Sequence, residues 1–269
     1  MQAGRVVVTG AGSGLGRELA LRYARAGWRV AVADISTERA DAVVAELRAL
    51  GAKAHAFPVD VGDDASVQAL QQAVQERLGG TDHLINNAGV ASAGDVIETT
   101  MDDWRWMIDI NLLGVVRGCR AFVPGMIAQG RGHVVNIASF AALAGAPGMA
   151  TYAVAKAGVV TLSESLRAEM AVKNTGVGVS AVCPAFFQTN LLQNFRGPDH
   201  ARRFAGRMME GSGDTAEGVA DHIFQAAQRG QFLILPTRRE PMRWRLKRWL
   251  PDLYFKRLIA MIGAQGRTK

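Results

Sequence analysis

Residues 5–16 read RVVVTGAGSGLG, an apolar stretch that runs directly into a glycine-rich turn. The first five residues are typical of a buried strand, and the residues after the turn, RELALRYARAG, have the spacing of a helix. Glycines at 10, 14 and 16 would let the backbone approach a pyrophosphate at the helix start, where free N–H groups attract an anion. Because the motif lies between a strand and a helix, we interpret it as a dinucleotide-binding turn.

Asp34 is the residue expected to select the cofactor, since it lies 18 residues after the last glycine of the turn and ends the next apolar stretch. Its carboxylate can accept a hydrogen bond from a ribose 2′-OH and would repel a 2′-phosphate, which favours NAD over NADP. Neither Ser13 nor Ile35 supplies the cation that a phosphate would need. Arg17 and Arg39 are close enough in sequence to keep NADP open as an alternative.

Apolar stretches and helical patterns alternate along the chain as far as about Pro236, with no repeat or low-complexity linker between them. Such alternation predicts a doubly wound α/β fold of the Rossmann type, built on a parallel sheet of seven strands. The expected strands are 5–9, 29–33, 53–58, 83–85, 133–138, 178–182 and 232–235, and the expected helices are 14–25, 37–50, 63–78, 102–126, 151–172 and 215–229. We therefore expect one NAD(P)-binding domain over residues 1–237 and an appended segment over 238–269.

The composition is that of a packed globular protein, with 49% apolar and 20% charged residues among 269. It excludes a disordered or collagen-like chain. Two cysteines, Cys119 and Cys183, cannot build a disulfide framework, and the sequence has no Cys/His cluster with the spacing of metal ligands, so we expect no metal. The N-terminus lacks the pattern of a secretory signal, and these features together favour a cytoplasmic protein.

The net charge of +7 is concentrated at the C-terminus. Residues 238–269 contain ten Lys/Arg and two acids, a net charge of +8, so residues 1–237 carry −1. Within this segment residues 241–262, PMRWRLKRWLPDLYFKRLIAMI, have apolar side chains at helical spacing on both sides of Pro251. The pattern predicts two short amphipathic helices, the second beginning at Pro251.

Two interpretations of this basic segment stay open. It can lie on an anionic membrane, which would make the protein peripheral at the inner membrane face. It can instead pack over a pocket or across a subunit interface, and we favour this second interpretation because amphipathic helices of enzymes usually pack on protein. We expect no nucleic-acid partner, since no base-reading motif accompanies the charge.

Four further motifs follow the glycine turn in order: NNAG at 86–89, INLLG at 110–114, NIASF at 136–140 and YAVAK at 152–156. Together with TGAGSGLG at 9–16 they resemble the short-chain dehydrogenase/reductase family in its single-domain form, over residues 4–236. The resemblance implies an oxidoreductase that transfers a hydride between a nicotinamide cofactor and a secondary alcohol or ketone.

The chemistry that this implies can be argued from the residue types. Tyr152 and Lys156 lie four residues apart on an expected helix, so their side chains project from one face. A neighbouring ammonium and an oxidised nicotinamide ring both favour the phenolate form of tyrosine, whose ordinary pKa of about 10 otherwise makes it a poor base. Ser139 ends a strand, where open α/β sheets place ligands, and is expected to hold the substrate oxygen. The resemblance adds Asn111, which would anchor a water in a proton relay from Lys156 to solvent.

The resemblance also implies the contacts of the cofactor. Asp60 would contact the adenine, Asn87 the region near the ribose, Lys156 the nicotinamide ribose and Thr189 the carboxamide. The full expected set is Gly10, Ser13, Gly14, Leu15, Gly16, Asp34, Asp60, Val61, Asn87, Ala88, Gly89, Tyr152, Lys156, Pro184 and Thr189. One position departs from the family pattern, because Pro184 is followed by alanine where glycine is usual, and the added methyl would narrow the site or shift the loop.

Residues 186–214 form a connection too long for a simple turn and are expected to act as a substrate lid. Apolar residues of the lid are Phe186, Phe187, Leu191, Leu192, Phe195, Phe204, Met208 and Met209, and Phe140, Leu143 and Met149 form a second apolar group. These side chains either line a pocket for a hydrophobic alcohol or ketone, or pack the lid onto the body, and both interpretations stay open.

The sequence therefore predicts an NAD-preferring dehydrogenase acting on a hydrophobic alcohol or ketone. An NADP-dependent carbonyl or 3-ketoacyl reductase is the alternative within the same class, and a non-catalytic nucleotide sensor is the alternative outside it. The complete set of Asn111, Ser139, Tyr152 and Lys156 counts against a sensor, which has no need of an acid/base pair. The resemblance favours a homodimer or homotetramer packed through the helices that carry Asn111 and Tyr152.

Overall fold

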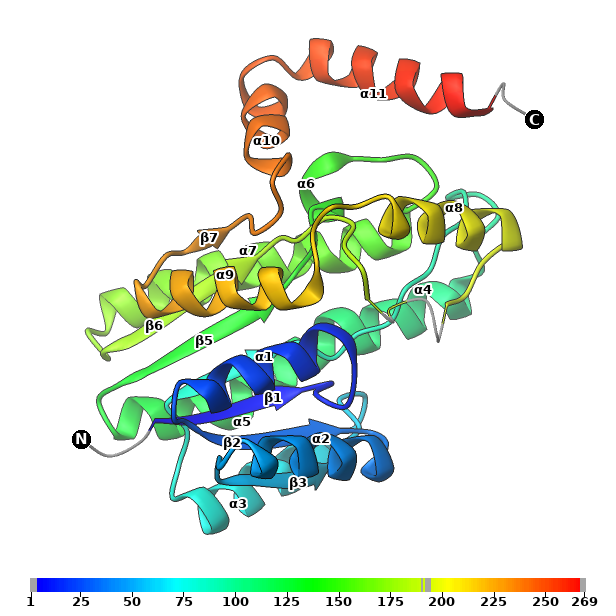
Figure 1. The fold of residues 1–269 in the computed structure, drawn as a ribbon. Helices are drawn as coiled ribbons and strands as arrows, with labels where there is room; N and C mark the ends of the chain where they lie inside the picture. Colours follow the sequence, from blue (N-terminus) through cyan, green and yellow to red (C-terminus); the bar gives the residue numbers. More distant parts are fainter. Residues whose placement is uncertain (1–3, 190, 192–194, 267–269) are drawn as a thin grey trace.

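The computed structural model of the protein describes residues 4–189, 191 and 195–266, with side chains as far as residue 261. A seven-stranded sheet in the order β3-β2-β1-β4-β5-β6-β7 runs through the molecule, and all of its pairings are parallel (Figure 1). The strands are β1 (Arg5–Thr9), β2 (Arg29–Asp34), β3 (Ala54–Pro58), β4 (His83–Asn86), β5 (Gly132–Ile137), β6 (Val177–Val182) and β7 (Leu233–Ile234). The doubly wound Rossmann fold is confirmed.

Helices connect the strands and cover both faces of the sheet. They are α1 (Gly14–Arg25), α2 (Thr37–Ala49), α3 (Asp64–Leu78), α4 (Met101–Ile108), the π-helical turn η1 (Asp109–Leu113), α5 (Gly114–Ala128), α6 (Ala141–Ala144), α7 (Ala150–Val172), α8 (Asp199–Glu210), α9 (Ala216–Gln228), α10 (Glu240–Trp249) and α11 (Pro251–Gly266). The ends of the predicted strands and helices lie within two residues of the observed ones. The predicted helix over 102–126 is divided by the π-helical turn, which the sequence pattern did not indicate.

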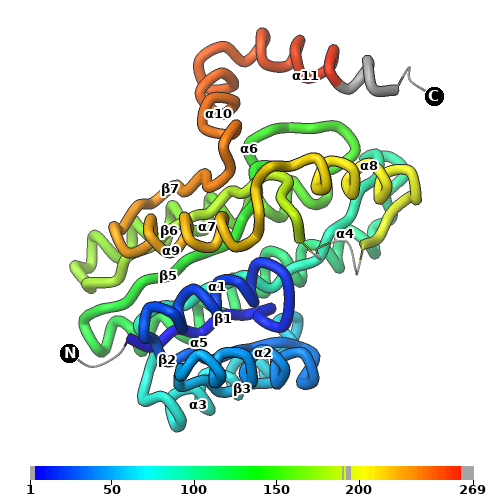
Figure 2. The backbone as a smooth tube through the Cα atoms, in the orientation of Figure 1, coloured from blue at the N-terminus to red at the C-terminus, as the bar shows by residue number. Residues whose placement is uncertain are grey.

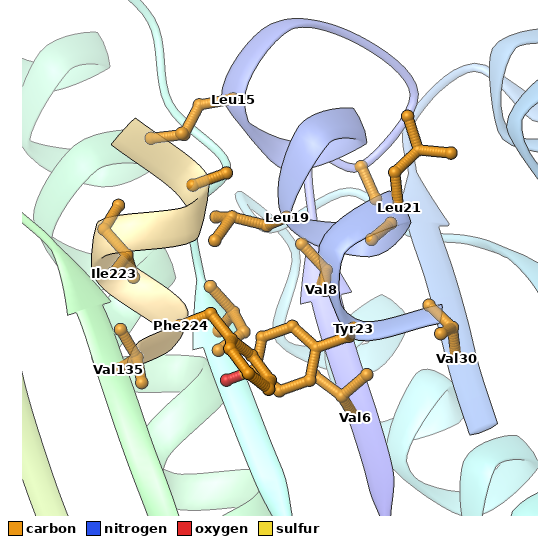
Figure 3. Close-up of a cluster of buried hydrophobic side chains, with 14 of the residues drawn as sticks. Val6, Val8, Leu15, Leu19, Leu21, Tyr23, Val30, Val135, Ile223 and Phe224 are labelled. Atoms are coloured by element: carbon orange, nitrogen blue, oxygen red, sulfur yellow. The ribbon is translucent and has the colours of Figure 1, made fainter. Parts of the chain in front are cut away.

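The core consists of two apolar layers, one on each face of the sheet. Side chains alternate along a strand, so Val6 and Val8 pack beneath α1, α2 and α9, whereas Val7 packs beneath α3, α5 and α7. Figure 3 shows the first layer, in which Tyr23 of α1 and Phe224 of α9 meet edge to face. Because the strands are buried on both faces, they appear in the sequence as nearly continuous apolar runs.

The stretch from α4 through α5, Met101–Ala128, is long and apolar enough to cross a membrane by length and composition alone. Half of its most apolar window is buried inside the protein, and Val115, Phe122 and Met126 belong to the layer beneath α3 and α5. We therefore interpret this stretch as a core helix of the α/β fold.

The topology brings distant motifs to one end of the sheet. β1 lies next to β4, so the chain reverses its winding direction between them, and ligands of open α/β sheets bind at such a point. The glycine turn leaves β1 there, NNAG includes the end of β4, and Ser139 and Pro184 follow β5 and β6. All four segments therefore face the same edge.

Residues 238–266 form a C-terminal arm that stands out beyond β7 and α6 (Figures 1 and 2). It contains α10 and α11, and the second helix begins at Pro251, as the pattern predicted. The arm is fastened to the body at α6, where Lys247 Nζ donates to the Leu143 carbonyl oxygen at 2.6 Å. The arm thus packs partly on its own chain.

Candidate active site

The turn after β1 requires glycine for two physical reasons. Gly10 and Gly14 have φ angles of +63° and +51°, a region that other residues rarely adopt. A side chain at Gly16 would collide with the Gly10 carbonyl and lie 2.6 Å from Asn87 Nδ2, so only glycine allows this close approach. Leu15, between them, points into the core beneath α1 (Figure 3). The turn therefore holds the start of α1 against the end of β1.

The start of α1 presents donors for an anion. Ser13 is the N-cap residue and makes no side-chain hydrogen bond to the helix, and the first turn holds no acidic residue. The free N–H groups and the helix dipole there attract negative charge. Ser13 and Gly14 line a cavity of about 800 Å³ that also borders Arg39, whose Nε is the buried side-chain polar atom left without a partner among the described residues. These residues fit the pyrophosphate and adenosine half of a dinucleotide.

Asp34 ends β2 with only 4% of its surface exposed, and protein donors hold its carboxylate. Oδ2 accepts from the Gly12 N–H at 2.9 Å, and Oδ1 accepts from the Ser36 N–H at 3.0 Å and from Arg39 Nη2 at 2.9 Å. Asp34 thus joins the glycine turn to the start of α2, where Ser36 is the N-cap. Its contact with a ribose stays a prediction.

Both arginines that kept NADP open are already paired with carboxylates. Arg17 pairs with Glu18 and Glu46, and Arg39 pairs with Asp34. A further glutamate, from α8, also lines the cavity. Two cations therefore face four carboxylates in and beside this cavity. A 2′-phosphate would meet net negative charge here rather than a free cation.

The first two residues after β4, Asn87 and Ala88, shape the glycine turn. Asn87 Nδ2 donates to the carbonyl oxygens of Thr9 at 2.9 Å and Gly10 at 3.2 Å. In return Thr9 Oγ1 accepts from the backbone N–H groups of Asn87 at 3.0 Å and Ala88 at 3.1 Å. Thr9 was not among the expected site residues, although it opens the TGAGSGLG motif. The Asn87 side chain is thus committed to the loop, and its predicted contact near a ribose is not tested.

Asn111 lies in the π-helical turn η1 and is completely buried. Its Oδ1 accepts from the Val90 N–H at 2.9 Å, and its Nδ2 donates to the Val90 carbonyl at 2.8 Å. A Cβ at Gly89 would lie 2.7 Å from Asn111 Oδ1 and 3.6 Å from Lys156 Nζ, so this segment packs directly against both side chains. π-helical turns often occur at functional sites, and this one fixes Asn111 beside the lysine. Its role in a water relay stays a prediction.

Tyr152 and Ser139 approach each other from α7 and from the end of β5. Burial raises the pKa of Tyr152, a hydrogen bond with Ser139 lowers it, and Cys183 raises it further, so the phenol stays protonated at neutral pH in the absence of other charges. Ser139 Oγ accepts from the Ala141 N–H at 3.1 Å and donates to the Pro184 carbonyl at 3.4 Å. The serine is therefore held between two loops, with its hydroxyl at the tyrosine.

Lys156 lies beneath this pair with 3% of its surface exposed. Its Nζ donates to the Ile137 carbonyl at 2.8 Å and lies 5.9 Å from the centroid of the Tyr152 ring. Burial lowers its pKa to about 8, so the ammonium persists at neutral pH. The sequence predicted an ammonium next to the phenol. In the structure this ammonium lies near the Tyr152 ring, although its hydrogen bond goes to the Ile137 carbonyl rather than to the phenol. Burial remains the largest influence on the pKa of Tyr152.

Cys183 is a site residue that the sequence did not predict. It follows β6, and its thiol lies close enough to influence both Tyr152 and Lys156 electrostatically. Burial raises the pKa of the thiol to about 12, against the opposing effects of a backbone hydrogen bond from Ser139 and the charge of Lys156. The only sequence signal for it was its place directly before Pro184 at the end of a strand.

Asp60 and Val61 lie in the loop between β3 and α3. Asp60 is exposed, and its Oδ1 accepts from the Gly62 N–H at 2.8 Å. The Val61 carbonyl accepts from Arg117 Nη1 at 3.1 Å. Neither residue is among those that line the 800 Å³ cavity, so their contact with an adenine stays a prediction.

Pro184 lies just before the segment expected to act as a lid, and its carbonyl accepts from the Phe140 N–H at 2.8 Å. Thr189 lines the same cavity as the glycine turn, and its expected contact with the carboxamide stays a prediction. Further along, the guanidinium of Arg196 lies 3.9 Å from the centroid of the Trp106 ring, and the Ala93 N–H donates to the Arg196 carbonyl at 3.1 Å. This part of the segment expected to act as a lid therefore contacts the loop after β4 and α4.

The apolar residues of the expected pocket divide between two roles. Phe187 and Leu143 pack in the core layers, as the packing interpretation required. Met149 instead belongs to a small apolar cluster around Tyr152, together with Val90, Trp106, Met107, Leu112, Ala141 and Ala155. Leu192 lies outside the described residues. The tyrosine thus has apolar surroundings, formed mainly by residues that the sequence had not singled out.

A glycine turn for a pyrophosphate, an acid at the end of β2, and a Ser, Tyr and Lys set at one end of a parallel sheet define a nicotinamide-dependent oxidoreductase. Comparison with known proteins agrees. The short chain dehydrogenase family model matches residues 4–199. Probable oxidoreductase EphD of Mycobacterium tuberculosis is 38% identical over 188 residues, which are 70% of this chain and 31% of that protein, so the chain spans about a third of this relative.

Two further relatives are similar over most of their own length. Meso-2,3-butanediol dehydrogenase of Serratia marcescens is 37% identical over 216 residues, 80% of this chain and 83% of that protein. The crystal structure of a short-chain dehydrogenase/reductase from Burkholderia phymatum in complex with NAD matches with a TM-score of 0.89 and 33% identity, covering 94% of this chain and 95% of that one. The chain belongs to the short-chain dehydrogenase family. Its relatives are named oxidoreductases and dehydrogenases, which counts against the nucleotide sensor.

Proposed function

We propose that the protein is an NAD-preferring dehydrogenase that transfers a hydride between the cofactor and a hydrophobic secondary alcohol or ketone. The preference for NAD is supported by one observation above all: Asp34 is fixed by Gly12, Ser36 and Arg39 beside a cavity in which carboxylates outnumber cations. The alternative, an NADP-dependent carbonyl or 3-ketoacyl reductase, requires a cation for the 2′-phosphate. Arg39 would have to leave Asp34 to provide one.

The nicotinamide cofactor supplies or accepts the hydride when it is bound. Tyr152 gives the proton to the substrate oxygen or takes it away, and Ser139 orients that oxygen through its hydroxyl. Lys156 keeps a positive charge beneath the phenol, because its pKa of about 8 leaves it protonated at neutral pH. Since burial raises the pKa of Tyr152, the phenolate needs this charge and the positive ring together. Asn111, fixed next to Lys156, passes the proton onward through a water.

The remaining expected residues bind the cofactor in this proposal. Gly10, Ser13, Gly14, Leu15 and Gly16 receive the pyrophosphate through their backbone. The adenosine side is contacted by Asp34, Asp60 and Val61, and the nicotinamide side by Asn87, Ala88, Gly89, Tyr152, Lys156, Pro184 and Thr189. Ala185, which replaces the usual glycine, is held by a hydrogen bond from its N–H to Thr237 Oγ1 at 3.2 Å, so its added methyl stands on a fixed loop.

The apolar cluster around Tyr152 supports a hydrophobic substrate. Val90, Trp106 and Met149 are each only partly buried, so they leave apolar surface near the hydroxyl that transfers the proton. Replacing water there with an alkyl or aromatic group gains about 25 cal/mol for each Å² of apolar surface buried. The lid over residues 186–214 would close over that substrate.

We further propose that residues 1–237 are the catalytic domain and 238–269 an extension, and that the protein works in the cytoplasm as a homodimer or homotetramer. The helices that carry Asn111 and Tyr152 leave large apolar side chains exposed, among them Leu113 and Val154. An interface through these helices would bury both side chains between subunits.

The experiment compares kcat/KM for NAD and NADP on an alcohol found by screening aliphatic, aromatic and steroid alcohols for formation of reduced nicotinamide. Wild type should favour NAD. Asp34→Asn, which keeps the shape but removes the charge, should reduce the difference in kcat/KM between NAD and NADP, because Arg39 is then free to attract the 2′-phosphate. Asp34→Asn combined with Arg39→Ala should reduce this difference less, because that arginine is missing. Equal or better use of NADP by the wild type would refute the NAD preference and support the alternative.

A further inference from the structure

The C-terminal arm exposes apolar side chains that the described chain does not cover. The exposed fraction is 78% for Trp249, 73% for Met242 and 66% for Ile259, and Leu250 and Phe255 are also exposed. Seven of the seventeen large apolar side chains exposed among the described residues lie in the arm, so this short segment concentrates the apolar surface of the molecule. Such a concentration marks a surface that contacts something other than water.

Cations are interleaved with these apolar groups. Met242, Arg245 and Trp249 are spaced three and four residues apart, so they share one side of α10, and all three are exposed. Arg248 is exposed on a neighbouring side, with its guanidinium 5.6 Å from the centroid of the Trp244 ring. Tryptophan and arginine side by side on an exposed helix are typical of helices that lie in the headgroup region of a bilayer.

We infer that the arm docks on an anionic lipid surface. The choice of partner follows from the charge: residues 238–269 carry +8, whereas residues 1–237 carry −1. A second copy of this chain would offer the arm a nearly neutral surface together with another basic arm. An anionic bilayer offers continuous negative charge for the arginines and an apolar interior for Trp249, Met242 and Ile259.

The arm also lies next to the substrate side of the active site. Lys247 Nζ donates to the Leu143 carbonyl of α6 at 2.6 Å, and a Cβ at Gly145, the residue after α6, would lie 3.3 Å from the Phe255 ring. α6 begins with Ala141, whose N–H donates to Ser139. Docking would therefore bring the bilayer close to Ser139, the residue proposed to orient the oxygen of a hydrophobic alcohol or ketone. This consequence rests on the proposed function, whereas the docking itself does not.

The test measures partition of the full-length protein, without substrate, into sedimented vesicles of phosphatidylcholine with and without phosphatidylglycerol, at low and high salt. We expect binding only with phosphatidylglycerol, and weaker binding as salt screens the charge. Arg245→Glu combined with Arg248→Glu should reduce the partition coefficient at least about 30-fold, since each basic residue near such a surface contributes about 1 kcal/mol. Trp249→Ser should also weaken binding, because it removes an apolar anchor.

The matched control is Lys53→Glu combined with Arg229→Glu, which changes the net charge equally at two exposed positions outside the arm. It should leave partition unchanged. The inference is overturned if the control loses as much binding as the arm variant, if phosphatidylcholine alone suffices, or if no vesicle binds the protein at low salt. It is equally overturned if the arm variant changes the subunit number in light scattering without vesicles, because the arm would then be a subunit interface. A hydrophilic substrate, in contrast, would refute only the proposed function.

Discussion

Two buried histidines should make the protein lose stability in mild acid. His83 of β4 is hydrogen-bonded through Nδ1 to the Tyr23 hydroxyl at 2.7 Å, and His133 of β5 through Nε2 to Ser180 Oγ at 2.8 Å. The two rings lie 5.4 Å apart. Burial lowers the pKa of His83 to about 3, with a contribution from His133 that outweighs the opposing charge of Asp82, and burial lowers the pKa of His133 to about 4.

The size of the effect follows from these values. In the unfolded chain both imidazoles have a pKa of about 6.5, so below that pH the unfolded state binds protons that the folded state does not. Stability is therefore complete above about pH 6.5 and is lost as the pH falls. From pH 7.5 to 5 each histidine costs about 2 kcal/mol, because the slope approaches about 1.4 kcal/mol per pH unit only below pH 6.5, and the pair costs about 4 kcal/mol. A typical domain has only about 5–15 kcal/mol in total.

The assay is urea unfolding followed by circular dichroism at fixed protein concentration between pH 7.5 and 5. His133→Gln keeps a donor near Ser180, and His83→Asn keeps a polar atom near Tyr23, so each should remove about half of the pH dependence while lowering stability at pH 7.5. The pKa of His55 is also lowered by burial, but this residue is present in every variant, so its contribution to the pH dependence is the same in all of them. The control, His222→Gln, changes an exposed residue of α9. A double variant that kept the full loss between pH 6.5 and 5 would refute the reasoning.

The remaining predictions concern the site and a control position outside it. Tyr152→Phe should lower kcat at least about 100-fold with little change in the Kd of the cofactor, because only the proton-transfer group is lost, and near-normal turnover would exclude the acid/base role. Lys156→Ala should impair both quantities. Gly16→Ala should abolish cofactor binding in a fluorescence titration, because its Cβ would collide with the Gly10 carbonyl, whereas Gly125→Ala, with open space around it, should be neutral or stabilise by up to about 1 kcal/mol.

Most of the fold could be predicted from the sequence because one-dimensional patterns determine it. A parallel strand buried on both faces must be apolar throughout, as RVVVT is, and each glycine or cap that ends an element is a local signal. The π-helical turn at Asp109–Leu113 was not predicted, because its residues DINLL continue an ordinary helical pattern. The helix α8 was not predicted either, because its segment is polar and follows a long loop.

The candidate site was predictable in its residue types and less so in its contacts. Motif spacing placed Ser139, Tyr152 and Lys156 at one end of the sheet, and the structure brings them together. No spacing rule indicated that Lys156 donates to the Ile137 carbonyl or that Cys183 lies beside it. Such contacts depend on side chains from strands that are distant in sequence, and only the folded sheet sets them next to each other.

Cofactor preference illustrates this limit most clearly, because it depends on how charges are paired rather than on which charges are present. From the sequence, Asp34 favoured NAD, whereas Arg17 and Arg39 kept NADP open as an alternative. In the folded protein Arg17 is engaged by Glu46 of α2, and Arg39 by Asp34 itself. An arginine that is already paired with a carboxylate gains little binding free energy by pairing with a phosphate instead, because the carboxylate would lose its partner. The exchange becomes favourable only if the carboxylate is removed or another donor replaces the arginine. A ribose 2′-OH is such a donor, so we expect the same ion pair to be compatible with NAD and to oppose NADP.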